Sequence, residues 1–106
     1  MPKYLWQVAY TAEGARGLLK EGGTSRRAVV EQLIKEAGGS LEAFYYAFGE
    51  DDVVCIVDVP DAKTATAISL TVGASGAARV KTTVLLSPED IDDAVQISVR
   101  YRPPGA

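Results

Sequence analysis

The densest run of ionisable side chains in the sequence is Glu50, Asp51 and Asp52, which directly follows Gly49. One of these carboxylates could bind a cation or act as a general base if it faced a pocket or a subunit interface. Three carboxylates alone do not make a metal site, because a metal ion needs several converging ligands. The simpler interpretation is a solvated hairpin turn in which Gly49 supplies an unusual backbone angle and Asp52 accepts hydrogen bonds from turn amides. We therefore predict no metal site.

Aromatic side chains form the second group that could do chemistry. Such rings most often pack in cores and interfaces. Between a sheet and its helices they would also line an apolar pocket suited to a flat organic ligand. Arg26 could anchor a carboxylate or phosphate of that ligand, although an ion pair with Asp52 or Glu50 is the favoured alternative. The candidate ligand-binding residues are Trp6, Tyr10, Arg26, Tyr45, Tyr46 and Asp52.

The sequence contains no histidine, which excludes the Ser-His-Asp and Cys-His nucleophile systems and the usual zinc sites. Its single cysteine, Cys55, lies within the apolar run VVCIVDV. We interpret Cys55 as a small core residue of a buried strand, because a reactive thiolate needs a cationic or helix-terminal neighbourhood. A haem or redox role would have only tyrosine or Cys55 as ligands, so we predict no cofactor.

The composition limits the class of protein. The 106 residues suffice for one globular domain, and 47% of them are hydrophobic and 24% charged. The net charge of −3 and the scattered basic residues exclude the basic stripe that a nucleic-acid-binding surface needs. No apolar run approaches the roughly 18 residues of a membrane span, and the first ten residues lack the apolar core of a signal peptide. We expect a cytoplasmic protein with no nucleic-acid or membrane partner.

Apolar periodicity predicts the elements that position these residues. Alternating side chains predict four strands, at residues 4–10, 41–48, 53–59 and 79–86. Apolar stripes predict two helices, at residues 24–37 and 62–72, and Pro88 is expected to begin a last helix. The stripe of the first helix consists of Val30, Leu33, Ile34 and Ala37, and the packed face of the second consists of Ala65, Ile68, Ser69 and Val72. The order is β-α-β-β-α-β, which is typical of a ferredoxin-like α+β fold with a four-stranded antiparallel sheet and helices on one face.

The remaining segments are assigned by their turn and cap residues. Residues 11–23 are expected to form a loop with one helical turn around 15–20. Thr24 or Ser25 is the expected N-cap of the first helix and Asp61 that of the second. We expect one domain over residues 1–98 and an extended or disordered tail over 99–106.

The strands are apolar on both faces, although the helices of this topology cover only one. The first strand carries Tyr4, Trp6 and Tyr10. The second has Phe44, Tyr46 and Phe48 on one face and Leu41, Ala43, Tyr45 and Ala47 on the other. An uncovered face of this composition exceeds the apolar patch that monomers tolerate. We expect a homodimer, or a higher homo-oligomer, that packs sheet on sheet or joins two sheets into a barrel. The alternative is that the C-terminal segment IDDAVQISVRY folds back over the open face.

Several motifs in order resemble the GYD domain family. They are Gly38-Gly39, the aromatic strand, the turn from Gly49 to Asp52, the strand VVCIVDV and the Pro60-Asp61 break. Gly49 and Asp52 match the family's Gly-x-Tyr-Asp-like element, and Asp51 stands where its tyrosine usually sits. Arg26 also falls where the family tends to carry an arginine. The resemblance implies a dimeric α/β barrel of the ferredoxin-like superfamily and implies no activity.

Two functional hypotheses follow. The first is a non-catalytic oligomeric module that binds a small aromatic ligand or serves in assembly. The second is a cofactor-light, monooxygenase-like enzyme acting on an aromatic or quinone-like compound, by analogy with related dimeric-barrel families. An enzyme predicts an enclosed apolar pocket with two or more converging polar groups, whereas a purely structural module predicts tightly packed aromatics and no cavity.

Overall fold

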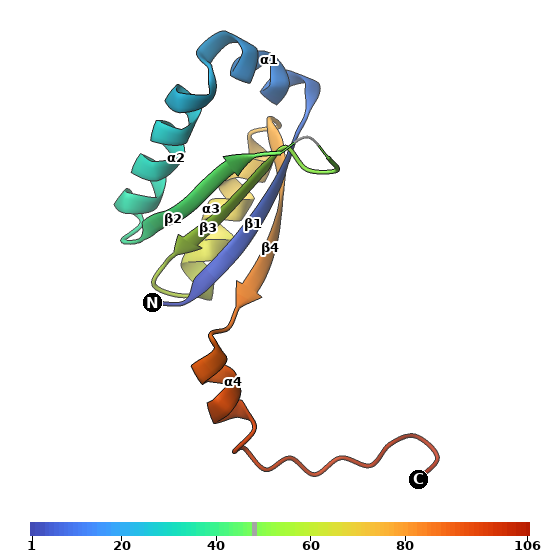
Figure 1. Cartoon of the computed structure of the whole chain (residues 1–106). Coiled ribbons are helices and arrows are strands. Elements are labelled where there is room, and N and C mark those ends of the chain that lie inside the picture. Colours follow the sequence, from blue (N-terminus) through green and yellow to red (C-terminus); the bar gives the residue numbers. More distant parts are fainter. Residues whose placement is uncertain (48) are drawn as a thin grey trace.

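The computed structural model describes residues 1–47 and 49–106, so Phe48 and its predicted place on the second strand lie outside the described residues. Four strands and four helices follow one another along the chain (Figure 1). They are β1 (Lys3–Tyr10), α1 (Ala12–Glu21), α2 (Gly23–Glu36), β2 (Ser40–Tyr46), β3 (Val53–Asp58), α3 (Ala62–Ala74), β4 (Ala78–Leu85) and α4 (Pro88–Ala94). The predicted strands and the two long predicted helices are confirmed with boundaries that differ by at most two residues.

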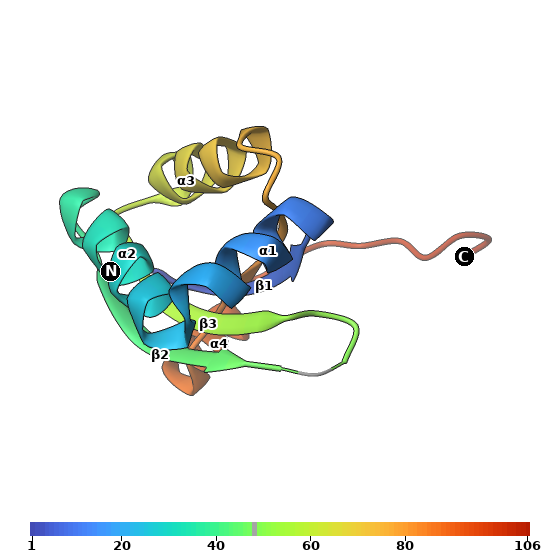
Figure 2. The ribbon, with the colours of Figure 1, turned by 90° about the horizontal axis from the view of Figure 1, so that it is seen from above.

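The strands form one antiparallel sheet in the order β2-β3-β1-β4. The first crossover, through α1 and α2, joins β1 to β2 around β3, and the second, through α3, joins β3 to β4 around β1. These two interleaved split βαβ units confirm the ferredoxin-like α+β fold. Figure 2 shows α1, α2 and α3 on one side of the sheet. No described helix is long and apolar enough to cross a membrane.

The core lies between the sheet and helices α2 and α3. Alternation along β1 directs Tyr4 and Trp6 toward the helices, and alternation along β3 buries Val53, Cys55 and Val57 on the same side. The predicted stripe of α2 is confirmed, since Ile34 is fully buried and Val30, Leu33 and Ala37 pack against the core. From α3, Ala65 and Ile68 are buried as predicted.

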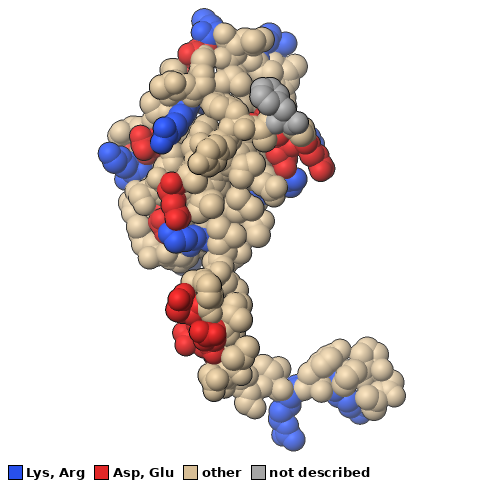
Figure 3. Space-filling view, viewed as in Figure 1, with Lys and Arg blue, Asp and Glu red and all other residues tan. Residues whose placement is uncertain are grey.

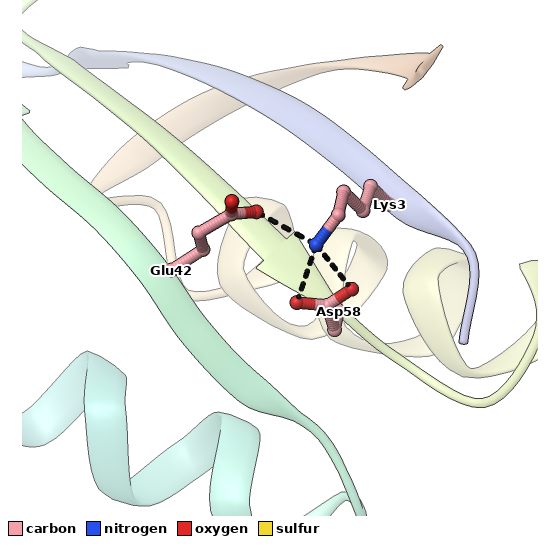
Figure 4. A network of polar contacts seen from close by, with 3 residues as sticks. All are labelled: Lys3, Glu42 and Asp58. Carbon is pink, nitrogen blue, oxygen red and sulfur yellow. Dashed lines mark hydrogen bonds and ion pairs between the residues drawn. The ribbon is translucent and has the colours of Figure 1, made fainter. Parts of the chain in front are cut away.

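A β-bulge in β2 overturns one predicted face. Leu41 pairs with Val57 and Ala43 pairs with Ile56, so Glu42 is an extra residue between them. Leu41 therefore packs against the core on the helix side, rather than sharing the open face with Ala43 as strict alternation predicts. Lys3 Nζ on β1 forms ion pairs with Glu42 Oε2 and with Oδ1 of the β3 residue Asp58, each at 2.9 Å (Figure 4). This ion network joins three strands at the bulge.

Residues 12–21 form the helix α1 rather than a loop with one helical turn, which corrects the prediction. Thr11 caps α1 by accepting a hydrogen bond from the Gly14 amide and donates its hydroxyl to the Gly76 carbonyl at 2.7 Å. Glycines lower helix propensity by about 1 kcal/mol each, which concealed this helix in the sequence. Gly14 is required by packing, because a Cβ at that position would collide with the Ala77 carbonyl oxygen.

The N-terminus of α2 also differs from the prediction. Neither Thr24 nor Ser25 caps it; both lie in its first turn, and the N-cap is Gly22 with φ 83°. Only one residue separates α1 from α2, and its left-handed backbone makes the corner between the two helices. The predicted cap of α3 is confirmed, since the Asp61 side chain accepts from the Thr64 amide at 2.9 Å.

The opposite face of the sheet carries no helix. Its middle is apolar, with Leu5, Val54 and Ile56 partly buried by one another and Tyr45 exposed at its side. Figure 3 shows this face with uncharged side chains in the middle and charged ones toward its margins. Tyr4 and Trp6 do not contribute to this face. They lie on the other side of the sheet, in the core beneath the helices. The C-terminal segment does not fold back over this face; it runs away from the sheet and is exposed (Figure 1).

Candidate functional site

An apolar pocket of about 290 Å³ lies between the sheet, α2 and α3. Trp6, Val8 and Cys55 form part of its floor, and Leu33 of α2 and Ile68 of α3 belong to its walls. The sequence places apolar residues there because every second residue of a strand and every third or fourth of a helix faces the same layer. The helices do not close over the sheet completely, which leaves this hollow in the core side of the fold.

Trp6, whose side chain belongs to the pocket lining, carries a buried polar group. The residue is only 4% exposed, and its indole Nε1–H has no hydrogen-bond acceptor among the described residues. A buried donor without an acceptor costs about 1–3 kcal/mol. An acceptor that reached this N–H would remove that cost.

Arg26 and Tyr10 add polar groups to the same pocket. Burial raises the pKa of Tyr10 above its ordinary value, the neighbouring Tyr46 adds to this, and the charge of Arg26 opposes it. Burial likewise raises the pKa of Tyr46, again against Arg26. Both phenols therefore keep their protons at neutral pH and act as hydrogen-bonding groups rather than as bases.

Arg26 does not form the ion pair that the sequence favours. Its Nη1 lies 3.6 Å from Oε2 of Glu21, and neither Asp52 nor Glu50 pairs with it in the described part of the chain. The reason is the short α1–α2 corner, which brings the last residue of α1 beside the first turn of α2. At 3.6 Å and with both side chains partly exposed, this pair is weak, and the guanidinium retains capacity to bind an anion.

A second, more open hollow of about 410 Å³ lies beside the first. Tyr10 lines both hollows, and Tyr46 and Asp52 line the second together with residues of α1. The Tyr46 hydroxyl donates to the Gly23 carbonyl at 2.9 Å, and its ring stands edge-on to Phe44 with centroids 5.3 Å apart. The structure thus brings five of the six candidate residues to two adjoining hollows that meet at Tyr10.

The sixth candidate, Tyr45, lies on the open face of the sheet and is 70% exposed. Its position follows from alternation, because its neighbour Tyr46 faces the helices. In the carboxylate run, Asp51 pairs with Lys81 at 3.2 Å and Glu50 is exposed. No group of three or more potential metal-ligating side chains occurs among the described residues.

Cys55 is a buried floor residue of the pocket, as the apolar run predicts. Burial raises the pKa of its thiol to about 11. The thiol therefore stays protonated at neutral pH and serves as a small apolar group. It is not a nucleophile in this state, because only a thiolate is strongly nucleophilic.

Ser69 and Thr71 of α3 and its C-cap Ser75 contribute hydroxyl side chains to the pocket lining. The sequence places Ser69 on the packed face of this helix but does not connect it with a pocket. It gives no sign of Thr71 and Ser75, because no local pattern marks a hydroxyl that borders a hollow formed by distant segments.

The comparison with protein-family models agrees with this architecture. The GYD domain model matches residues 4–95, which include both hollows and all of the sheet except Lys3. No curated protein and no solved structure matches the chain. Since the matched residues make up most of its length, the chain belongs to the GYD domain family.

Proposed function

We propose that this protein is a small-molecule-binding module whose ligand occupies the pocket between the sheet, α2 and α3. The observation that carries the proposal is the buried Trp6 indole N–H, which has no acceptor among the described residues and belongs to a residue of the pocket lining. A purely structural module would have tightly packed aromatic side chains and no cavity, whereas Trp6 and Tyr10 line a pocket.

The lining indicates the chemistry of the ligand. A volume of about 290 Å³ lies at the lower end of the range of small-molecule sites. It suits a molecule of one or two rings. Apolar side chains dominate the lining, and Arg26 supplies a cation. The ligand that fits is flat and largely apolar, with one carboxylate or other anionic group for Arg26 and an acceptor for the indole N–H.

A titration with two matched probes tests this proposal. The probes are naphthalene-2-carboxylate and the neutral naphthalene-2-carboxamide. Trp6 is the only tryptophan, so its indole N–H gives a single NMR resonance that reports directly on the pocket. We expect both probes to move this resonance, and the carboxylate to bind more tightly. No movement at millimolar concentrations of either probe would overturn the proposal.

Matched variants identify the anchoring residue and the pocket. Arg26→Gln should weaken the carboxylate about tenfold or more, which corresponds to about 1.4 kcal/mol, and should leave the carboxamide unchanged. Arg27→Gln, its exposed neighbour outside the lining, is the control. Ser69→Leu should fill the hollow and weaken both probes, whereas Thr66→Leu on the exposed side of α3 should weaken neither.

The same pocket supports a second candidate, the cofactor-light enzyme acting on a quinol-like compound. It meets the geometric requirement of an apolar hollow with converging polar groups, Arg26 and Tyr10. Consumption of dioxygen in the presence of a hydroquinone, above the rate without protein and abolished by Ser69→Leu, would support the enzyme. Binding without consumption supports the module.

Self-association is part of the proposal. The apolar middle of the open sheet face, with Leu5, Val54 and Ile56, fits a homo-oligomer that packs sheet on sheet. Each such side chain adds on the order of 1.5–3 kcal/mol when fully buried, before the costs of association. Sedimentation over a range of concentrations tests this expectation, and a monomer at millimolar concentration contradicts it.

A further inference from the structure

The segment that follows α4 has the residue pattern of a strand, and its apolar side chains are not covered by the rest of the described chain. Val95, Ile97, Val99 and Tyr101 alternate with polar residues, and each is between 68% and 78% exposed. β-branched and aromatic residues at every second position are typical of a half-buried strand. Pro103 and Pro104 follow immediately and would end it, since proline cannot donate to a sheet ladder.

The amides of residues 95–97 donate to carbonyls of α4, whereas residues 98–102 form no backbone hydrogen bond among the described residues. One edge of the sheet, β4, likewise has a free side, because among the described strands β4 pairs with β1 alone. Val84 near the end of β4 and Leu86 just after the strand are both exposed. An added strand would satisfy both sets of backbone groups and cover these apolar side chains.

The chain cannot readily supply that strand to its own β4, because α4 directs the segment outward. The Ser87 hydroxyl accepts from the Asp90 amide at 3.0 Å, and the Asp90 carboxylate accepts from the Ser87 amide at 2.9 Å. This capping box fixes the start of α4 directly after the sheet. Figure 1 shows α4 and the segment after it leading away from β4.

The charges favour a second copy of this chain as the partner. α4 carries four carboxylates, Glu89, Asp90, Asp92 and Asp93, whereas β4 carries no carboxylate and two cations, Arg79 and Lys81, of which Lys81 already pairs with Asp51. Two copies that exchange their C-terminal segments would bring an acidic helix toward a basic strand in both directions. A reciprocal exchange of this kind closes as a C2 dimer, which leaves no free end for further addition.

We infer that residues 98–102 add as an edge strand to β4 of a second copy, in a reciprocal exchange between two chains, and that the turn at residues 95–97 opens to extend this strand. The inference rests on the proposed self-association and specifies one contact that holds the copies together. The ligand pocket contains no residue of this segment, although Ala78 and Val80 of β4 belong to its lining.

Two full-length double variants test the exchange. Ile97→Asp with Val99→Asp adds two charges to the apolar side of the segment, and Gln96→Asp with Ser98→Asp adds the same two charges to its polar side. All these residues lie outside the core, so both variants keep the fold. Sedimentation gives the dimer dissociation constant, and hydrogen exchange followed by mass spectrometry gives the protection of residues 98–102.

We expect the apolar-side variant to raise the dissociation constant at least tenfold and to lose protection at residues 98–102, while the control retains both. Equal effects of the two variants would overturn the exchange. Unprotected amides in a wild-type dimer would also overturn it and leave sheet-on-sheet association standing. A wild-type monomer would overturn both proposals, and protection within a monomer would show the segment folded on its own chain. Binding of naphthalene-2-carboxylate is expected to be unchanged in both variants.

Discussion

The backbone N–H of Tyr10 donates a 2.7 Å hydrogen bond to the carboxylate of Asp52. The amide of Asp52 in turn donates to the Val8 carbonyl at 2.8 Å. These two bonds tie the end of β1 to the connection between β2 and β3, at the place where the two hollows meet. Asp52 thus has a structural task that accounts for its position, and it orients Tyr10 between the hollows.

Replacing Asp52 should therefore destabilise the fold. Asp52→Ala removes a charge-assisted bond to a partly buried amide, which we expect to lower the free energy of unfolding by about 1.5–3 kcal/mol. Urea denaturation followed by circular dichroism measures this. Glu50→Ala, at an exposed neighbouring position, should change stability by less than about 0.5 kcal/mol. Equal effects at the two positions would contradict the assignment.

Two glycines of α1 should respond in opposite directions to the same change. Gly14→Ala places a Cβ against the Ala77 carbonyl oxygen and should destabilise the protein. At Gly17 a Cβ meets nothing within 4 Å, so Gly17→Ala should stabilise the protein by about 0.5–1 kcal/mol through helix propensity. Thermal denaturation of the two variants decides the matter. A stabilised Gly14→Ala variant would mean that α1 does not pack on Ala77.

The Cys55 thiol should make stability fall in alkaline solution. Its pKa is about 11 in the folded protein and 9.0 for the ordinary group. The unfolded chain therefore loses this proton first, and ionisation favours unfolding as the pH rises from about 9 to 11. The contribution is fully present below pH 9.

Comparison with Cys55→Ala isolates this effect from other titrating groups, Tyr10 and Tyr46 among them. Urea denaturation between pH 7 and pH 10.5 should show a steeper loss of stability for the wild type than for the variant. Alkylation by iodoacetamide at pH 8 should also be much slower in the folded than in the unfolded protein. Parallel pH profiles would show that the thiol is accessible.

Trp6→Phe should cost little stability in the absence of ligand. The change removes an indole N–H that lacks an acceptor, which gains about 1–3 kcal/mol, and leaves a smaller ring that loses a similar amount of packing. We expect a net change within about 1 kcal/mol by urea denaturation followed by circular dichroism. Trp6→Ala, which also removes the ring, should cost about 3–5 kcal/mol. A cost for Trp6→Phe as large as that of Trp6→Ala would indicate that the N–H is satisfied in solution.

The sequence by itself determined the periodic parts of this protein. Alternation along β1 and β3, the apolar stripe of α2 ending in Ile34, the Asp61 cap and the buried Cys55 all depend on neighbours within a few residues. Local spacing contains the necessary information for these features, because side chains two, three or four positions apart share a face. The ferredoxin-like order of elements follows from the same spacing.

Only the tertiary structure decided the features that depend on distant segments. The bulge at Glu42 moves Leu41 to the core because Lys3 and Asp58 hold the extra residue from other strands. The Gly14 contact with Ala77, 63 positions away in the chain, permits a helix where glycine content predicts a loop. Arg26 takes Glu21 as its neighbour because the corner between α1 and α2 is one residue long. In each case the outcome depends on a contact between segments that only the packed fold brings together. Local propensity contains no information about such contacts.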